Sequence, residues 1–102
     1  MNRVKIANLL GLACRAGSVV CGNFAAAKYL KKKSVPMLFL ASDGSRDTTE
    51  PYHRLAEKKG ITVCELFTKE ELGRAVGKEQ NVVVLLTDRG FAKAIDTMLK
   101  GS

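Results

Sequence analysis

No run of apolar residues in this chain approaches the ~20 residues that a helix needs to cross a bilayer. The apolar stretch near the N-terminus, Ala7–Ala13, is short, and Arg15 follows it closely. It therefore favours an amphipathic helix over a signal peptide. We expect one domain over residues 1–102, located in the cytoplasm and without a membrane partner.

Residues that ligate metals are few and scattered. The cysteines Cys14, Cys21 and Cys64 are an odd number without a C-x-x-C spacing, and His53 is the only histidine. Because zinc sites need clustered ligands, this pattern predicts no metal site. We expect the cysteines to be buried or half-buried thiols in a reducing compartment. We expect His53 to be exposed or hydrogen-bonded on a helix.

Signatures of catalysis and of nucleotide binding are also missing. The chain has no G-x-x-x-x-G-K-[ST] loop, and no G-x-G-x-x-G follows a predicted strand. One histidine and three dispersed cysteines give little basis for a nucleophilic Cys–His pair. The sequence therefore predicts no enzyme, no cofactor and no small-molecule substrate.

Acidic residues are absent from the first 42 residues of the chain. This stretch holds seven of the 17 basic residues, whereas residues 43–102 hold ten basic and ten acidic residues. The whole net charge of +7 therefore lies in the first two-fifths of the chain. Such a concentrated excess favours a polyanion as the partner. The alternative is that these residues only keep one face of the protein solvated.

Helix and strand signals alternate along the chain and predict five helices and four strands. Asn23 and Asp88 suit the caps of the second and fifth helices, and Thr68 and Glu71 form a capping box for the fourth. Pro51 is expected in the first turn of the third helix. The expected strands are residues 18–21, 37–41, 61–67 and 82–86. This order predicts one compact α/β structure with helices on both faces of the sheet.

The segment Gly22–Lys33 carries the clearest functional pattern. Successive residues of a helix are rotated by about 100°, so the side chains of Phe24, Lys28, Lys31 and Lys32 lie on one face of the predicted helix. This face therefore carries one aromatic ring and three ammonium groups. The opposite side, which we expect to pack on the sheet, carries Ala26, Ala27 and Leu30. Lysines neutralise phosphates, free N–H groups at a helix start receive one, and an exposed ring can stack on an unpaired base. The alternative is that Phe24 joins the core and the lysines are merely solvated.

Three stretches of the sequence are distinctive, namely LLGLACRAGSVVCG, MLFLASD and KEELGRAVGKEQNVVVLLTDRGFAKAI. Together they resemble the bacterial YlxQ-type branch of the L7Ae family of ribosomal proteins. The likeness runs nearly end to end, and LLGLACRAG and ELGRAVGKE are its most specific parts. The resemblance implies a three-layer α/β/α sandwich with a four-stranded mixed sheet. It also implies binding to RNA, typically to a kink-turn, which is a sharp bend built on sheared G·A pairs.

The resemblance implies two RNA-binding pieces. The first is a G-x-N-E-x-x-K motif at the start of the second helix, in which Gly22 and Lys28 match the glycine and the lysine. The second is the loop before the fourth strand, which matches Gly77, Lys78, Glu79 and Gln80. Phe24 and Ala25 stand where the motif has Asn and Glu, and neither can make the hydrogen bonds that read G·A pairs. Asn23 lies one position early and suits a helix cap.

We therefore expect a non-catalytic protein that binds structured RNA, ribosomal or otherwise linked to translation, with the ribosome or translation proteins as further partners. The candidate RNA-binding residues are Gly22, Asn23, Phe24, Lys28, Lys31, Lys32, Gly77, Lys78, Glu79 and Gln80. The alternative is a protein-interaction adapter that kept the fold and uses Phe24 and Ala25 as an apolar patch. An exposed Phe24 keeps both hypotheses open, whereas a buried one would remove the main support for the adapter.

Overall fold

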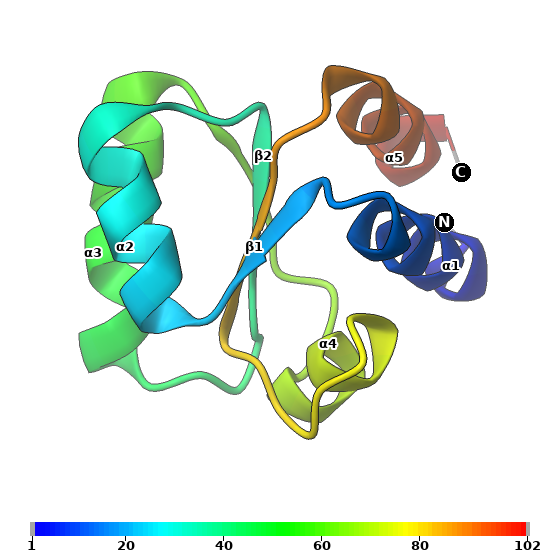
Figure 1. The fold of residues 1–102 in the computed structure, drawn as a ribbon, viewed down its shortest axis with the longest axis horizontal. Coiled ribbons are helices and arrows are strands. Elements are labelled where there is room, and N and C mark those ends of the chain that lie inside the picture. Colours follow the sequence, from blue (N-terminus) through cyan, green and yellow to red (C-terminus); the bar gives the residue numbers. More distant parts are fainter. Residues whose placement is uncertain (1, 102) are drawn as a thin grey trace.

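The computed structural model describes residues 2–101, in which helices and strands alternate (Figure 1). In chain order they are α1 (Arg3–Arg15), β1 (Val19–Cys21), α2 (Asn23–Lys32), β2 (Met37–Leu40), α3 (Arg46–Lys59), β3 (Thr62–Cys64), α4 (Lys69–Ala75), β4 (Val83–Leu86) and α5 (Arg89–Gly101). The five helices and four strands predicted from the sequence are confirmed within this range.

The four strands form one mixed sheet in the order β1-β4-β2-β3. Strands β2 and β3 are parallel, whereas β4 runs antiparallel to both of its neighbours, β1 and β2. The two central strands, β2 and β4, are buried along their whole length, as their continuous apolar sequences predict. Because of these directions, β1, β2 and β3 all end where β4 begins. We call this the lower end of the sheet, since it points downward in Figure 1.

Helices cover both faces of the sheet, so the predicted three-layer α/β/α sandwich is confirmed (Figure 1). Side chains alternate along β2, so that Leu38 and Leu40 pack under α2 and α3. Phe39 points the other way, into a core with Leu10 of α1 and Ile95 of α5. Each face of the sheet therefore has its own apolar core, and α2 is held through the first of them.

Two predicted element boundaries are wrong. The third strand covers Thr62–Cys64 rather than residues 61–67. Helix α3 begins at Arg46, because Ser45 caps it by accepting a hydrogen bond from the N–H of Asp47. Pro51 therefore lies in the second turn of the helix rather than the first, where it removes the helical hydrogen bond to the Asp47 carbonyl.

The thiols and the histidine are placed as the sequence predicts. Cys14 and Cys21 are half-buried and Cys64 is buried, all three as free thiols. His53 lies half-buried on α3, with its Nε2 atom 3.2 Å from a carboxylate oxygen of Glu65. Among residues 2–101, no three His, Cys, Asp or Glu side chains gather where they could hold a metal ion. Within the same residues, every helix is too short or too polar to cross a bilayer.

Candidate functional site at the lower end of the sheet

The turn from β1 into α2 depends on Gly22. Its N–H donates to the carbonyl of Val83 at 2.9 Å, which continues the pairing of β1 with β4. Its backbone has φ 93° and ψ 152°, a combination that is essentially restricted to glycine. Gly22 is also the residue that caps α2, so the prediction that Asn23 is the cap is wrong. The Asn23 Oδ1 atom instead accepts a hydrogen bond of 2.7 Å from the hydroxyl of Tyr52.

A glycine cap leaves the start of α2 open. The first helical hydrogen bond runs from the N–H of Ala26 to the carbonyl of Gly22 at 2.9 Å. The N–H groups of the three preceding residues have no acceptor within the helix. Among the residues that the structure describes, no side chain accepts from them at this cap. These N–H groups therefore face solvent together with the positive end of the helix dipole, an arrangement that favours an anion.

The outer face of α2 carries the predicted set of side chains. The Phe24 side chain is 83% exposed, and Lys28, Lys31 and Lys32 are exposed as well. Ala26 and Leu30 are buried against the sheet, as predicted, but Ala27 is exposed and that prediction is wrong. Ala27 lines a groove of about 430 Å³ between α2 and α3, so α3 does not cover its side chain.

The loop between α4 and β4, which contains Gly77, Lys78, Glu79 and Gln80, is held tightly against α4. The N–H of Lys78 donates to the carbonyl of Gly73 at 2.7 Å, and the N–H of Asn81 donates to the carbonyl of Lys69 at 2.9 Å. A Cβ atom on Gly73 would lie 2.6 Å from the carbonyl oxygen of Glu79. Sequence analysis missed this role of Gly73, although the residue lies within the distinctive stretch ELGRAVGKE.

The β1–α2 turn and the α4–β4 loop meet at the lower end of the sheet (Figure 1). The bond between Gly22 and Val83 places the start of α2 beside the residues that enter β4. Burial raises the pKa of the Cys21 thiol, the nearby Cys14 acts in the same direction, and the Lys78 ammonium acts in the opposite direction. Lys31 is farther away, because eight residues of helix at ~1.5 Å each separate it from Asn23 by about 12 Å.

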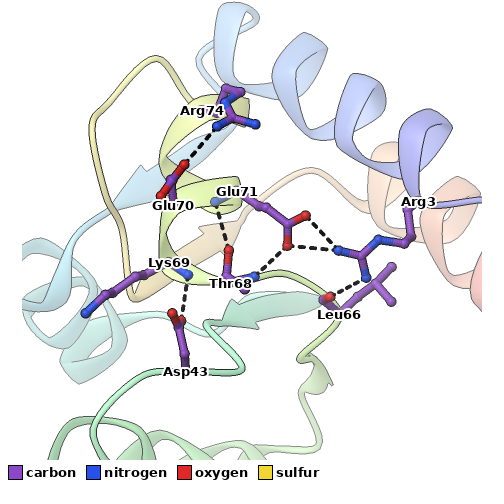
Figure 2. A network of polar contacts seen from close by, with 8 residues as sticks. All are labelled: Arg3, Asp43, Leu66, Thr68, Lys69, Glu70, Glu71 and Arg74. Carbon is purple, nitrogen blue, oxygen red and sulfur yellow. Dashed lines mark hydrogen bonds and ion pairs between the residues drawn. The ribbon is translucent and has the colours of Figure 1, made fainter.

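A polar network fixes the helix that carries the loop (Figure 2). Thr68 and Glu71 form the predicted capping box of α4, with bonds of 3.2 and 2.9 Å. The Arg3 guanidinium of α1 lies 2.8 Å from both carboxylate oxygens of Glu71. The Thr68 N–H and the Arg3 guanidinium lower the pKa of the Glu71 carboxyl below its usual value. The Asp43 carboxylate, from the loop after β2, accepts from the N–H of Lys69 at 2.8 Å.

The lysines of the candidate site are free of carboxylate partners. Ion pairs occur elsewhere, but among residues 2–101 none involves Lys28, Lys31, Lys32 or Lys78. Glu79 is the only acidic side chain of the loop Gly77–Gln80. This end of the molecule therefore presents ammonium groups, open helix N–H groups and one exposed ring to an incoming ligand, beside the exposed carboxylates of Glu79, Asp43 and Asp47.

Comparisons with known proteins agree on the sequence and on the fold. Residues 4–95 match the sequence profile of the Ribosomal protein L7Ae/L30e/S12e/Gadd45 family. The RNA-binding protein YlxQ of Enterococcus faecium is 30% identical over 100 residues, which cover 98% of this chain and 96% of that protein. The RNA-binding protein YlxQ of Bacillus subtilis (strain 168) is 33% identical over 91 residues, which cover 89% and 91%.

Two solved structures share the architecture. A protein with unknown function from Bacillus halodurans has a TM-score of 0.86 and 29% identity, over 93% of this chain and 96% of that one. The Giardia lamblia 15.5kD RNA binding protein has a TM-score of 0.81 over 96% of this chain and 87% of that one. At 16% identity, the second similarity shows the common fold alone.

Proposed function

Because the chain belongs to the ribosomal protein L7Ae/L30e/S12e/Gadd45 family, we propose that it binds structured RNA at the lower end of its sheet and has no catalytic role. One observation carries the proposal: the open start of α2 and the α4–β4 loop meet beside lysines that form no ion pair with a carboxylate of residues 2–101. Phosphate oxygens are the ligands that suit helix N–H groups and ammonium groups together.

The lysines along α2 contact different parts of the RNA backbone. Lys28 lies on the second turn, where its ammonium and the open N–H groups hold phosphates near the loop. Lys31 and Lys32 extend the same basic face about 4.5–6 Å beyond Lys28 along the helix, over a neighbouring part of the RNA backbone. Lys78 and Gln80 close the far side. We assign the surface between them to Gly22, Asn23, Phe24, Gly77 and Glu79, all of which are exposed or half-buried.

We further propose that the RNA is ribosomal or kink-turn-like, and that the protein acts with the ribosome in translation. The two YlxQ relatives are RNA-binding proteins by name, which supports an RNA partner. Crosslinking in cells, followed by sequencing of the bound RNA, tests the choice of RNA. Recovery of one segment of ribosomal RNA is the expected result. Recovery of protein partners without RNA would instead favour an adapter.

The affinity for a structured RNA should fall steeply as salt is added. If four phosphates are neutralised by Lys28, Lys31, Lys32 and Lys78, log K against log salt has a slope of about −2.8 to −3.6, at roughly 0.7–0.9 per contact. Fluorescence anisotropy titrations between about 50 and 200 mM potassium chloride measure this slope. A slope near zero would remove the electrostatic basis of the proposal.

The substitution Lys28→Ala should weaken binding to every structured RNA by about 1 kcal/mol and make the salt slope shallower by about one unit. A lysine on a phosphate positions the RNA without reading its sequence, so the loss is similar for different RNAs.

Lys58→Ala is the matched control, since Lys58 is exposed on α3 and lies outside the proposed site. Lys59 is unsuitable because its ammonium donates to the carbonyls of Leu30 and Lys33 at the end of α2. Equal losses in Lys28→Ala and Lys58→Ala would show diffuse binding and contradict the assigned site.

A further inference from the structure

The ring of Phe24 is the most exposed aromatic group at the proposed RNA site. It is 83% exposed, although burial of a phenylalanine side chain is worth roughly 1.5–3 kcal/mol. The other large exposed apolar side chains among residues 2–101 are Val4 and Leu12. Both belong to α1, on the opposite face of the sheet (Figure 1). On α2 the ring is bordered by the small exposed side chains of Ala25 and Ala27, and Ala27 lines the groove between α2 and α3.

The surroundings of the ring are small or cationic. Ala25 follows it on the helix with a single methyl group, and Gly22 precedes the helix without a side chain. Lys28 lies one turn farther along, with its Cβ atom about 5–6 Å from that of Phe24. The ring is thus accessible beside an ammonium group and the open N–H groups of the first turn.

The backbone under Phe24 is held in place before any ligand arrives. The N–H of Gly22 donates to the carbonyl of Val83 in β4. The single hydrogen of the Tyr52 hydroxyl is shared between the Asn23 carbonyl and side-chain oxygens, which lie 2.9 and 2.7 Å from the hydroxyl oxygen. A ligand that stacks on the ring therefore pays little to order the helix start.

We propose that Phe24 stacks on an unpaired base while Lys28 holds a neighbouring phosphate, so the RNA feature taken at this site is a nucleotide displaced from a bulge or loop beside a helix. This inference rests on the proposed RNA-binding function. Inside a duplex, both faces of a base are covered by its neighbours, so only an unpaired base offers a face to the ring. A protein partner would need a contiguous apolar patch of a few hundred Å², whereas the side chains next to this ring on α2 are two alanine methyl groups and the Lys28 ammonium.

The test uses two RNA hairpins that differ by one unpaired 2-aminopurine nucleotide in the stem. The unmodified protein should bind the bulged hairpin more tightly and change the fluorescence of the 2-aminopurine. Phe24→Ala should weaken binding to the bulged hairpin about 5- to 150-fold, the usual range for one base stacked on an aromatic ring. Binding to the fully paired hairpin should change by less than about twofold, because phosphate contacts remain.

Two further variants separate stacking from other roles of the ring. Phe24→Trp should keep the preference for the bulged hairpin, whereas Phe24→Leu should lose it, because leucine is apolar but cannot stack. All three variants should melt like the unmodified protein, since the ring is 83% exposed. Retention of the preference in Phe24→Leu would overturn stacking.

The same titrations distinguish failure of this inference from failure of the proposed function. If the unmodified protein binds both hairpins and Phe24→Ala changes neither affinity, RNA binding stands and the stacking role is wrong. If the unmodified protein binds neither hairpin nor ribosomal RNA, the proposed function itself fails, and the stacking role with it.

Discussion

The double substitution Phe24→Asn, Ala25→Glu should give this protein a strong preference for a standard kink-turn over a duplex of the same length. These two side chains would restore the motif G-x-N-E-x-x-K that the family resemblance implies. In that motif, Asn and Glu are the side chains expected to hydrogen-bond to sheared G·A pairs. Each such contact is worth about 1–3 kcal/mol, so the pair should add about 2–6 kcal/mol of discrimination. Both positions are exposed in the first turn of α2, so the fold should tolerate the change.

Titration of a kink-turn and of the matched duplex against both proteins, at one fixed salt concentration, measures this gain. Affinity for unstructured RNA serves as the control and should change little. The double variant should also lose the preference for a bulged base, because it lacks the ring of Phe24. If the unmodified protein already selects the kink-turn by a hundredfold or more, about 2.7 kcal/mol, other residues supply the readout and our interpretation of Phe24 and Ala25 is wrong.

Gly73→Ala should both destabilise the fold and weaken RNA binding. The added Cβ atom would lie 2.6 Å from the carbonyl oxygen of Glu79 and 2.7 Å from backbone atoms of Gln80, so the loop must move away from α4. Overpacking of this kind costs about 1–3 kcal/mol. We expect the upper end, because the clashing atoms belong to the backbone. A loss of about 3 kcal/mol lowers the melting temperature by roughly 12–24 °C.

Chemical denaturation and RNA titration of the same sample separate the two effects. Gly101→Ala is the matched control, because Gly101 also lies in a helix and, among residues 2–101, no atom outside its own helix backbone and its chain neighbours lies within 4 Å of the added Cβ. It should leave RNA affinity unchanged and should not lower stability. If Gly73→Ala left both stability and affinity at the level of the control, the close packing of the loop on α4 would not position the site.

Local sequence signals were sufficient wherever a structure depends on residues a few positions apart. Thr68 and Glu71 form the capping box that their spacing predicts, and the N–H of Phe91 donates to Asp88 at 3.0 Å as expected for a helix cap. The apolar strand runs at residues 37–41 and 82–86 match β2 and β4 to within one residue at one end. These features are decided within one turn or one strand, so spacing and side-chain type suffice.

The wrong predictions concern positions where a distant contact decides the outcome. Asn23 has the side chain of a cap, but the chain leaves its pairing with β4 at Gly22, whose φ is 93°, and the helix begins directly after it, so Gly22 is the cap. The Asn23 side chain instead accepts a hydrogen bond from the Tyr52 hydroxyl. Ala27 has the right angular position for burial, but the spacing between α2 and α3 leaves it in a groove. Helical periodicity predicts which way a side chain points, but it does not predict how closely the neighbouring helix packs over that side chain.

By itself, the sequence determined the segregation of positive charge into residues 1–42, the basic and aromatic outer face of Gly22–Lys33, and the absence of acidic residues from that face. Only the tertiary structure decided that the loop Gly77–Gln80 lies beside the start of α2, since the β1–β4 pairing brings them together. It also decided that α4 is fixed by Arg3, which meets Glu71 across 68 residues of chain. The physical reason is that composition and periodicity describe each segment alone, whereas a site built from two segments depends on strand order and register.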